Sequence, residues 1–291
     1  MPFVAARSAT ALAHKVLTGS PYKLPLHLKG VMLGVGFLFP ILDIVNSADY
    51  LYYSGIIDEC GRKRFDQQFR VIKNYVKKKK YETAAVLLRE TVFNLRRPDG
   101  KSLFQKLTGF EHHGSIKTPT RPKVALAYFR YANSTAFKRR IHVRSSRALD
   151  GTRSEVSMRI ALGDFFVDVQ KIFEFVLNKT RVLFYTAEFD DVFPAVNLDR
   201  CFKKLNWRDK KVFKYVHRIR WHKHDNVSLE LLGYEKTAGT LMYTTVLFGG
   251  HFISFDRSEV VSDLYSHFLD FPQVTPRKRK DQDSSAIITK C

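Results

Sequence analysis

The second half of the chain alternates between two hydrophobic periods. Apolar residues spaced three and four positions apart predict amphipathic helices at about 169–177, 194–206 and 256–270. Continuous or alternating apolar runs predict strands at 182–185, 229–234 and 241–248, and the last two are expected to be joined through residues 236–239. The whole stretch from about 212 to 249 has a β-like pattern. A strand that is apolar at every position is typically covered on both faces, as in a parallel sheet. The alternation of helices and strands therefore predicts an α/β fold.

The first half contains one strand signal among helices. An alanine-rich helix is expected at about 4–18, and the glycine-punctuated apolar segment 27–36 is expected to be a buried strand. Most of the section from 41 to 165 has helical periodicity, whereas the polar, basic residues beyond Pro272 are expected to be disordered. The pattern thus predicts four regions: residues 1–40, 41–165, 166–271 and 272–291.

Polar side chains follow two of the predicted strands. Glu188, Asp190 and Asp191 come after the strand at 182–185, and His251 follows the strand at 241–248. Ligands collect at the carboxyl ends of parallel strands, and an acidic residue followed later by a histidine is the chain order of an α/β-hydrolase triad. The non-catalytic alternatives are that the acidic residues simply belong to a polar surface loop and that His251 is an ordinary polar residue in a turn. Asp190 and His251 are therefore the candidate catalytic residues.

Composition indicates a folded protein with a basic surface. The hydrophobic fraction is 45%, the aromatic fraction is 13%, and the net charge is +21. A large positive charge suggests a polyanionic partner such as nucleic acid. The basic residues are nevertheless spread along the chain, with compact runs only at 77–80 and 277–280, and no nucleic-acid motif accompanies them. A basic surface with a basic tail is the favoured interpretation, and we do not expect nucleic acid as a partner.

No metal, cofactor or membrane partner is expected. Cys60, Cys201 and Cys291 lack metal-type spacing, and His222 and His224 have no evident third ligand. No apolar run approaches the roughly 20 residues of a membrane span. The N-terminus lacks the basic and apolar regions of an ordinary signal peptide. Localisation and oligomeric state are left open by these patterns.

Five segments, in order and covering about residues 3–271, resemble the serine carboxypeptidase family. Residues 28–36 (Leu-Lys-Gly-Val-Met-Leu-Gly-Val-Gly), 52–59 (Tyr-Tyr-Ser-Gly-Ile-Ile-Asp-Glu) and 137–143 (Phe-Lys-Arg-Arg-Ile-His-Val) are similar to three of its conserved stretches. Residues 181–190, Arg-Val-Leu-Phe-Tyr-Thr-Ala-Glu-Phe-Asp, resemble the segment that carries the family's triad aspartate, here Asp190. Residues 249–256, Gly-Gly-His-Phe-Ile-Ser-Phe-Asp, resemble the segment that carries its histidine, here His251.

The resemblance implies a fold and an activity. The fold would be a partial α/β-hydrolase core, with a mixed, mostly parallel sheet formed by residues 1–40 and 166–271 and a large helical insertion at 41–165. The family releases C-terminal amino acids from peptide or protein substrates at acidic pH, in secretory, lysosomal or vacuolar compartments, without a cofactor. A serine attacks the carbonyl, the histidine shuttles the proton, and the aspartate orients the histidine.

The sequence departs from the family at the nucleophile. The family motif Gly-Glu-Ser-Tyr-Gly-Gly would align just before Met1, and no Gly-x-Ser-x-Gly occurs among the 291 residues. Other family positions also differ: Val35 replaces an asparagine, Thr186-Ala187 replaces Asn-Gly, and Phe252-Ile253-Ser254 replaces Met-Val-Pro. We therefore expect negligible peptidase activity from this chain alone, whether it is truncated or a divergent copy. A non-catalytic peptide- or protein-binding relative and a basic nucleic-acid-binding protein are the alternatives.

Overall fold

The computed structural model describes residues 5–19, 26–93, 100–120, 122–148, 154–223 and 230–272. The chain forms two compact units, one from Met1–Tyr50 with Asp168–Cys291 and the other from Leu51–Val167. The expected boundary at residue 40 therefore lies earlier in the chain than this division. Residues 273–291 of the expected disordered tail, His224 and the segment 20–25 lie outside the described residues. No helix of the described chain is long and apolar enough to cross a membrane.

The first unit is built on a five-stranded sheet with the order β1-β2-β5-β4-β3. Its strands are β1 (Gly30–Gly34), β2 (Arg181–Ala187), β3 (Ile219–His222), β4 (Leu231–Ala238) and β5 (Leu241–Val246). Strands β1, β2 and β5 run parallel, whereas β4 and β3 are added antiparallel as a meander. The mixed sheet confirms the expected α/β fold, and it brings the carboxyl ends of β2 and β5 to the same edge.

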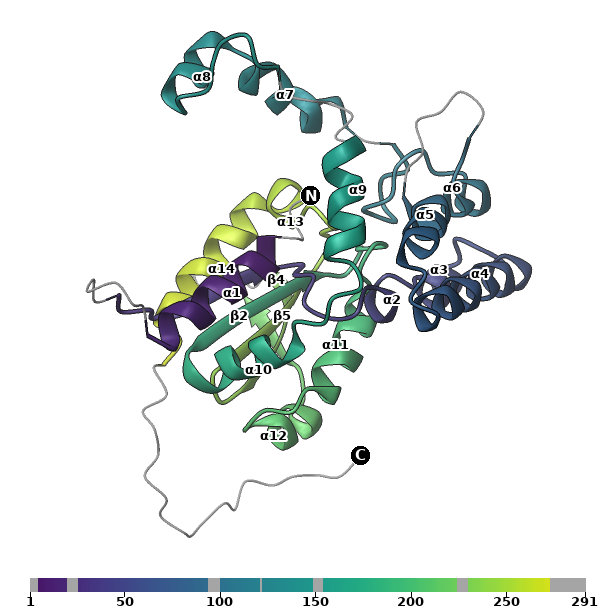
Figure 1. Ribbon diagram of the computed structural model, residues 1–291. Helices are drawn as coiled ribbons and strands as arrows, with labels where there is room; N and C mark the ends of the chain where they lie inside the picture. The colour runs from purple at the N-terminus through teal and green to yellow at the C-terminus, as the bar shows by residue number, and fades with distance from the viewer. Residues whose placement is uncertain are drawn as a thin grey trace. The chain divides into compact units, whose positions relative to one another are not determined.

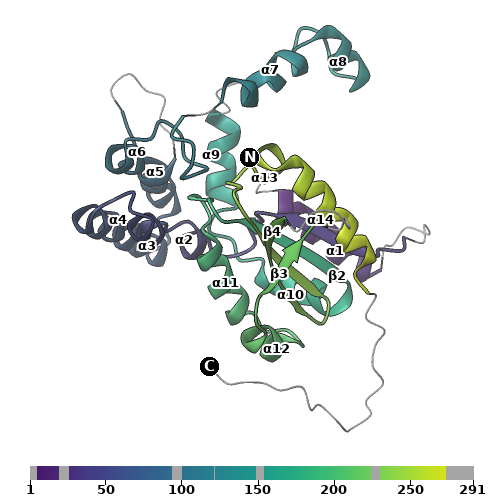
Figure 2. The ribbon, with the colours of Figure 1, turned by 180° about the vertical axis from the view of Figure 1, so that it is seen from behind.

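Helices cover both faces of this sheet (Figures 1 and 2). The helices of the unit are α1 (Ala5–Leu17), α2 (Ile41–Ile44), α10 (Gln170–Lys179), α11 (Ala195–Lys204), α12 (Lys210–Tyr215), α13 (Ile253–Asp256) and α14 (Ser258–Asp270). Phe184 on β2 contacts Phe202 of α11. The next residue, Tyr185, points to the opposite face and hydrogen-bonds through its hydroxyl to Tyr265 of α14 at 2.8 Å. Period-two alternation along a strand thus assigns α11 and α14 to opposite sides.

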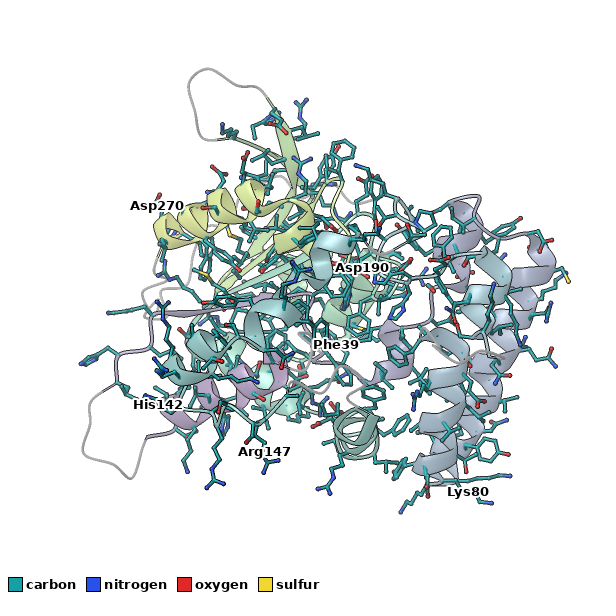
Figure 3. All side chains as sticks on the ribbon, turned by 90° about the horizontal axis from the view of Figure 1, so that it is seen from above. Phe39, Lys80, His142, Arg147, Asp190 and Asp270 are labelled. Atoms are coloured by element: carbon teal, nitrogen blue, oxygen red, sulfur yellow. The ribbon has the colours of Figure 1, made fainter. Side chains whose placement is uncertain are left out.

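An aromatic cluster fills the face on the α10 and α11 side. Phe184 and Tyr243, which are register partners on β2 and β5, stack with centroids 6.0 Å apart. Phe202 packs edge-on against both, and Phe39 and Phe173 extend the cluster (Figure 3 labels Phe39). These five side chains are fully buried. Edge-to-face aromatic packing of this kind fixes the sheet and α11 relative to each other, and with them the loops at the strand ends.

The second unit is helical and has its own core. Its helices are α4 (Glu59–Lys77), α5 (Tyr81–Val92), α6 (Leu103–Thr108), the 3-10 turn η2 (Lys123–Leu126), α7 (Ala127–Ala132), α8 (Thr135–Arg140) and α9 (Ser154–Gly163); α3 (Ala48–Tyr53) spans the division between the units. Asp58 caps α4 by accepting from Gly61 N at 2.6 Å, and Ser102 and Gln105 form a capping box at α6. Phe65, Ile72 and Leu88 are fully buried, as the one-faced apolar pattern of α4 and α5 predicts.

Two details of the sequence interpretation are wrong. Residues 210–215 form the short helix α12, where a β-like pattern was expected. Strand β4 extends to Ala238, so the hairpin to β5 turns at Gly239 and Thr240 and not across four residues from Lys236. Gly239 has φ +51°, a conformation that glycine adopts without strain.

Candidate functional site

The candidate residues lie on two loops that leave one edge of the sheet. The last register pair of β2 and β5 is Ala187 with Val246, and the loops continue in parallel beyond it. Glu188 N donates to Val246 O at 3.0 Å, and Phe189 N donates to Gly249 O at 2.9 Å. These backbone bonds extend the pairing past the strands and place Asp190 opposite the Gly-Gly-His turn.

His251 and Asp190 form a buried pair. Nδ1 of His251 lies 3.0 Å from Oδ2 and 3.2 Å from Oδ1 of Asp190. Asp190 has no exposed surface, and His251 is 6% exposed (Asp190 is labelled in Figure 3). A carboxylate against Nδ1 favours the tautomer or protonation state that carries a proton on Nδ1. In the neutral tautomer of this kind, the lone pair lies on Nε2, which is the nitrogen a general base would use.

The Asp190 carboxylate is held by its own loop. Oδ1 accepts from the backbone N–H groups of Val192 at 2.8 Å and Phe193 at 2.9 Å. An aspartate that bonds its backbone two and three residues ahead forms an Asx-type turn, so its side-chain direction is fixed locally. Both backbone bonds use Oδ1, and Oδ2 makes the shorter of the two contacts with the histidine. This arrangement orients the carboxylate before any ligand arrives.

The histidine turn is supported by a second set of contacts. Gly250 N donates to Oδ2 of Asp256 at 2.8 Å, which ties the turn to α13. The rings of Phe193 and Phe252 stand edge-on to the imidazole, with centroids 5.2 and 5.5 Å away. Phe248, just before the two glycines, has φ +60°, an uncommon value for a bulky residue. These edge-on ring contacts help to hold the imidazole of His251 in its position.

The other acidic residues of the loop, Glu188 and Asp191, are also packed into the structure. Oε2 of Glu188 accepts from Phe248 N at 3.2 Å, and Glu188 O accepts from the Tyr50 hydroxyl at 2.6 Å. Asp191 is 1% exposed, so the idea that this stretch is acidic merely because it is a surface loop does not hold. Phe193 and Asp256, which also support the pair, were not predicted from the sequence. For Phe193, the sequence did contain a signal: the apolar pair Val192-Phe193 directly follows two acidic residues.

Among the described residues, no group of three or more His, Cys, Asp or Glu side chains is placed to hold a metal ion. His222 lies on β3, whereas its companion His224 lies outside the described residues. What Asp190 and His251 can do together is proton transfer, with the carboxylate orienting the imidazole and stabilising its positive charge.

Comparison with known proteins decides the family. A family model described as "Peptidase_S10: Serine carboxypeptidase" matches residues 8–271, which is most of the chain. The chain belongs to the serine carboxypeptidase family. It is 26% identical over 268 residues to "Probable serine carboxypeptidase CPVL" of Mus musculus and 26% identical over 253 residues to "Venom serine carboxypeptidase" of Apis mellifera. These alignments cover 91% and 84% of this chain, respectively.

The structural comparison gives the same fold. The Saccharomyces cerevisiae protein described as KEX1(DELTA)P, a prohormone-processing carboxypeptidase, superposes with a TM-score of 0.63 at 16% sequence identity. The superposition covers 90% of this chain and 60% of that one. The partial α/β-hydrolase fold expected from the sequence is thereby confirmed. The chain spans 55% of the length of the mouse relative and 51% of the bee relative.

Proposed function

We propose that Asp190 and His251 are the aspartate and the histidine of a serine carboxypeptidase triad. The single observation that carries the proposal is the 3.0 Å contact between Nδ1 of His251 and Oδ2 of Asp190. In this role His251 accepts the proton of a seryl hydroxyl through Nε2 as the serine attacks the scissile carbonyl, and then returns it to the leaving amine. Asp190 stabilises the imidazolium that forms between these steps. The substrate class is a peptide or protein with a free C-terminus.

We also propose that residues 1–291 alone do not turn over such substrates. No serine of the sequence stands in a Gly-x-Ser-x-Gly elbow, and removal of the nucleophile from a triad takes away most of the rate enhancement. The helical unit Leu51–Val167 is proposed to be the family's insertion.

The test compares this chain with any longer native product. Residues 1–291 are incubated with N-blocked dipeptides at acidic pH, and the released C-terminal amino acid is quantified. We expect no release above the blank. If mass spectrometry of the native protein finds a Gly-x-Ser-x-Gly motif upstream, that longer chain is expected to release amino acid, and His251→Gln is expected to lower kcat by about 10³-fold or more.

Either proposal can fail separately. Release by residues 1–291 that His251→Gln abolishes would contradict their inactivity while it supports the role of the histidine. Release by a longer chain that His251→Gln leaves unchanged would contradict the role of the pair.

A non-catalytic relative that binds peptides is the second candidate; one backbone position favours the loss of catalytic constraint, and the peptide binding is left to the test. Val35, which stands where the family has asparagine, has φ +46° and is 5% exposed. Asparagine tolerates the left-handed region, whereas a β-branched residue there is strained. A strained valine at the end of β1 fits a chain that has drifted from its ancestral sequence. Peptide binding without turnover, measured by calorimetry with the same dipeptides, would support this candidate.

A further inference from the structure

The proposed function gives no role to one basic segment of the helical unit. Residues 122–148, here called the arm, comprise η2, α7, α8 and the residues that follow α8. Helix α7 contacts both η2 and α8. The helix α7 has no buried residue, and α8 has one, Lys138.

All charged residues of the arm are basic. The segment carries seven basic residues and no aspartate or glutamate: Lys123, Arg130, Lys138, Arg139, Arg140, Arg144 and Arg147. Six of them are exposed (Arg147 is labelled in Figure 3). The seventh, Lys138, is buried, and its ammonium group donates a hydrogen bond to Ser145 O at 3.0 Å. That bond, together with the bond from Val143 N to Lys138 O at 2.9 Å, ties the residues after α8 back to the helix that carries Arg139 and Arg140.

Apolar side chains are exposed between these cations. Val124 is 66% exposed, Tyr131 57%, Ile141 49% and Val143 40%. Ile141 and Val143 alternate with Arg140, His142 and Arg144 along the chain. Exposed aliphatic groups scattered singly need no explanation, but several within one short, uniformly cationic segment indicate an interaction surface.

We propose that the arm docks on the surface of an anionic lipid bilayer. Charge complementarity selects an anionic partner, because six exposed cations meet no anion within the segment. The exposed aliphatic and tyrosine side chains then select a bilayer, since they can enter the boundary between headgroups and acyl chains. A nucleic acid would use the arginines and tyrosines but would leave Val124, Ile141 and Val143 without an apolar counterpart.

This proposal revises the expectation that the protein has no membrane partner. That expectation rested on the lack of an apolar run long enough to span a bilayer. Surface docking needs no span, only basic residues and a few apolar side chains at the interface. The proposal does not depend on the peptidase role of Asp190 and His251.

The experiment measures sedimentation of residues 1–291 with sucrose-loaded vesicles. One vesicle contains phosphatidylcholine alone, and the other contains 30% phosphatidylserine; a run without vesicles corrects for aggregation. We expect binding to the anionic vesicles, with affinity that falls as salt is raised. Each basic residue near such a surface contributes roughly a fivefold factor, so Arg139→Gln with Arg140→Gln and Arg144→Gln should weaken binding by about 100-fold.

Two further variants test whether vesicle binding depends on the arm or only on the overall positive charge of the protein. Lys77→Gln with Lys78→Gln and Lys80→Gln removes the same number of exposed cations from the end of α4 and the start of α5, and should weaken binding less than about threefold (Lys80 is labelled in Figure 3). Ile141→Ser with Val143→Ser keeps every charge and should weaken binding by roughly tenfold.

Three outcomes would overturn the proposal. The first is that the anionic vesicles do not bind the chain. The second is that the lysine variant loses as much affinity as the arginine variant, because the attraction would then be a property of the whole surface. The third is that the Ile141 and Val143 substitutions have no effect while a 20-nucleotide RNA displaces the vesicles, which would indicate a nucleic-acid surface.

Discussion

At the residue scale, Asp190 joins the two loops of the candidate site. Its carboxylate accepts two backbone N–H bonds and faces His251, all without exposure to solvent. Asp190→Ala would leave the N–H groups of Val192 and Phe193 buried without this acceptor. We expect the free energy of unfolding to fall by about 3 kcal/mol or more, because unsatisfied buried donors each cost on the order of 1–3 kcal/mol. Urea denaturation followed by tryptophan fluorescence measures the loss.

The matched control is Asp168→Ala. Asp168 also accepts a backbone N–H, from Gln170 at 2.8 Å, but it is exposed to solvent. Water can replace it there, so we expect a loss of about 1 kcal/mol or less. Equal losses at both aspartates would show that Asp190 is not an organising residue of the loop.

His267 gives the sheet a pH-dependent contact. Nε2 of His267 on α14 lies 2.9 Å from Oε2 of Glu235 on β4, and the ring stacks on Trp221. The Glu235 hydrogen bond raises the pKa of His267 above 6.5, and Asp263 and Asp270 add to this effect. The stabilisation is thus complete below about pH 6.5 and is lost as the pH rises through the elevated folded-state pKa.

His267→Gln should therefore cost more stability at pH 5.5 than at pH 9. We expect a difference of about 1–2 kcal/mol between the two conditions, the contribution of a charge-assisted hydrogen bond. Thermal unfolding of both proteins at both pH values measures it. The exposed His142, changed to glutamine, is the control, and an equal loss at both pH values for His267→Gln would contradict a charged pair.

At the element scale, the contact between β4 and β5 depends on a glycine. A Cβ at Gly233 would overlap the backbone oxygen of Thr245 on β5. Because a backbone atom cannot rotate away as a side chain can, Gly233→Ala must push the two strands apart. We expect a loss of about 1–3 kcal/mol in the free energy of unfolding, measured by urea denaturation.

Gly163→Ala provides the control for this substitution. Gly163 ends helix α9, and a Cβ there meets nothing within 4 Å. Alanine has the higher helix propensity, so the variant should be as stable as the parent or up to about 1 kcal/mol more stable. A comparable loss at both glycines would mean that the overlap with Thr245 is not the cause.

The elements differ in how well the sequence predicts them. Strand β2 and helices α10, α11 and α14 were predictable because each has one period over enough residues to be recognised. Helix α12 was not, since its six residues bury only Phe213 and one buried position defines no period. Asp190 and His251 could be paired from the sequence because parallel strands end at one edge. The orientation of the two side chains could not be predicted. It depends on hydrogen bonds from the backbone N–H groups of Val192, Phe193 and Gly250, and every residue type except proline has such a group.

At the scale of the whole molecule, the two compact units have separate cores. Both tryptophans, Trp207 and Trp221, belong to the sheet unit, and Leu51–Val167 contains none. Tryptophan fluorescence therefore reports on the sheet unit alone, whereas far-UV circular dichroism also reports on the helices of the other. We expect the two urea denaturation curves not to coincide, because units with their own cores unfold as separate cooperative transitions.

Core substitutions should assign each transition to its unit. Leu88 of α5 and Leu198 of α11 are both fully buried leucines, and truncation of such a residue costs about 2–5 kcal/mol. Leu88→Ala should move the circular dichroism curve to lower urea and leave the fluorescence midpoint in place. Leu198→Ala should lower the fluorescence midpoint. If Leu88→Ala shifts both probes equally, the units unfold together, and the stability of the Asp190–His251 pair then depends on the helical unit as well as on the sheet that carries it.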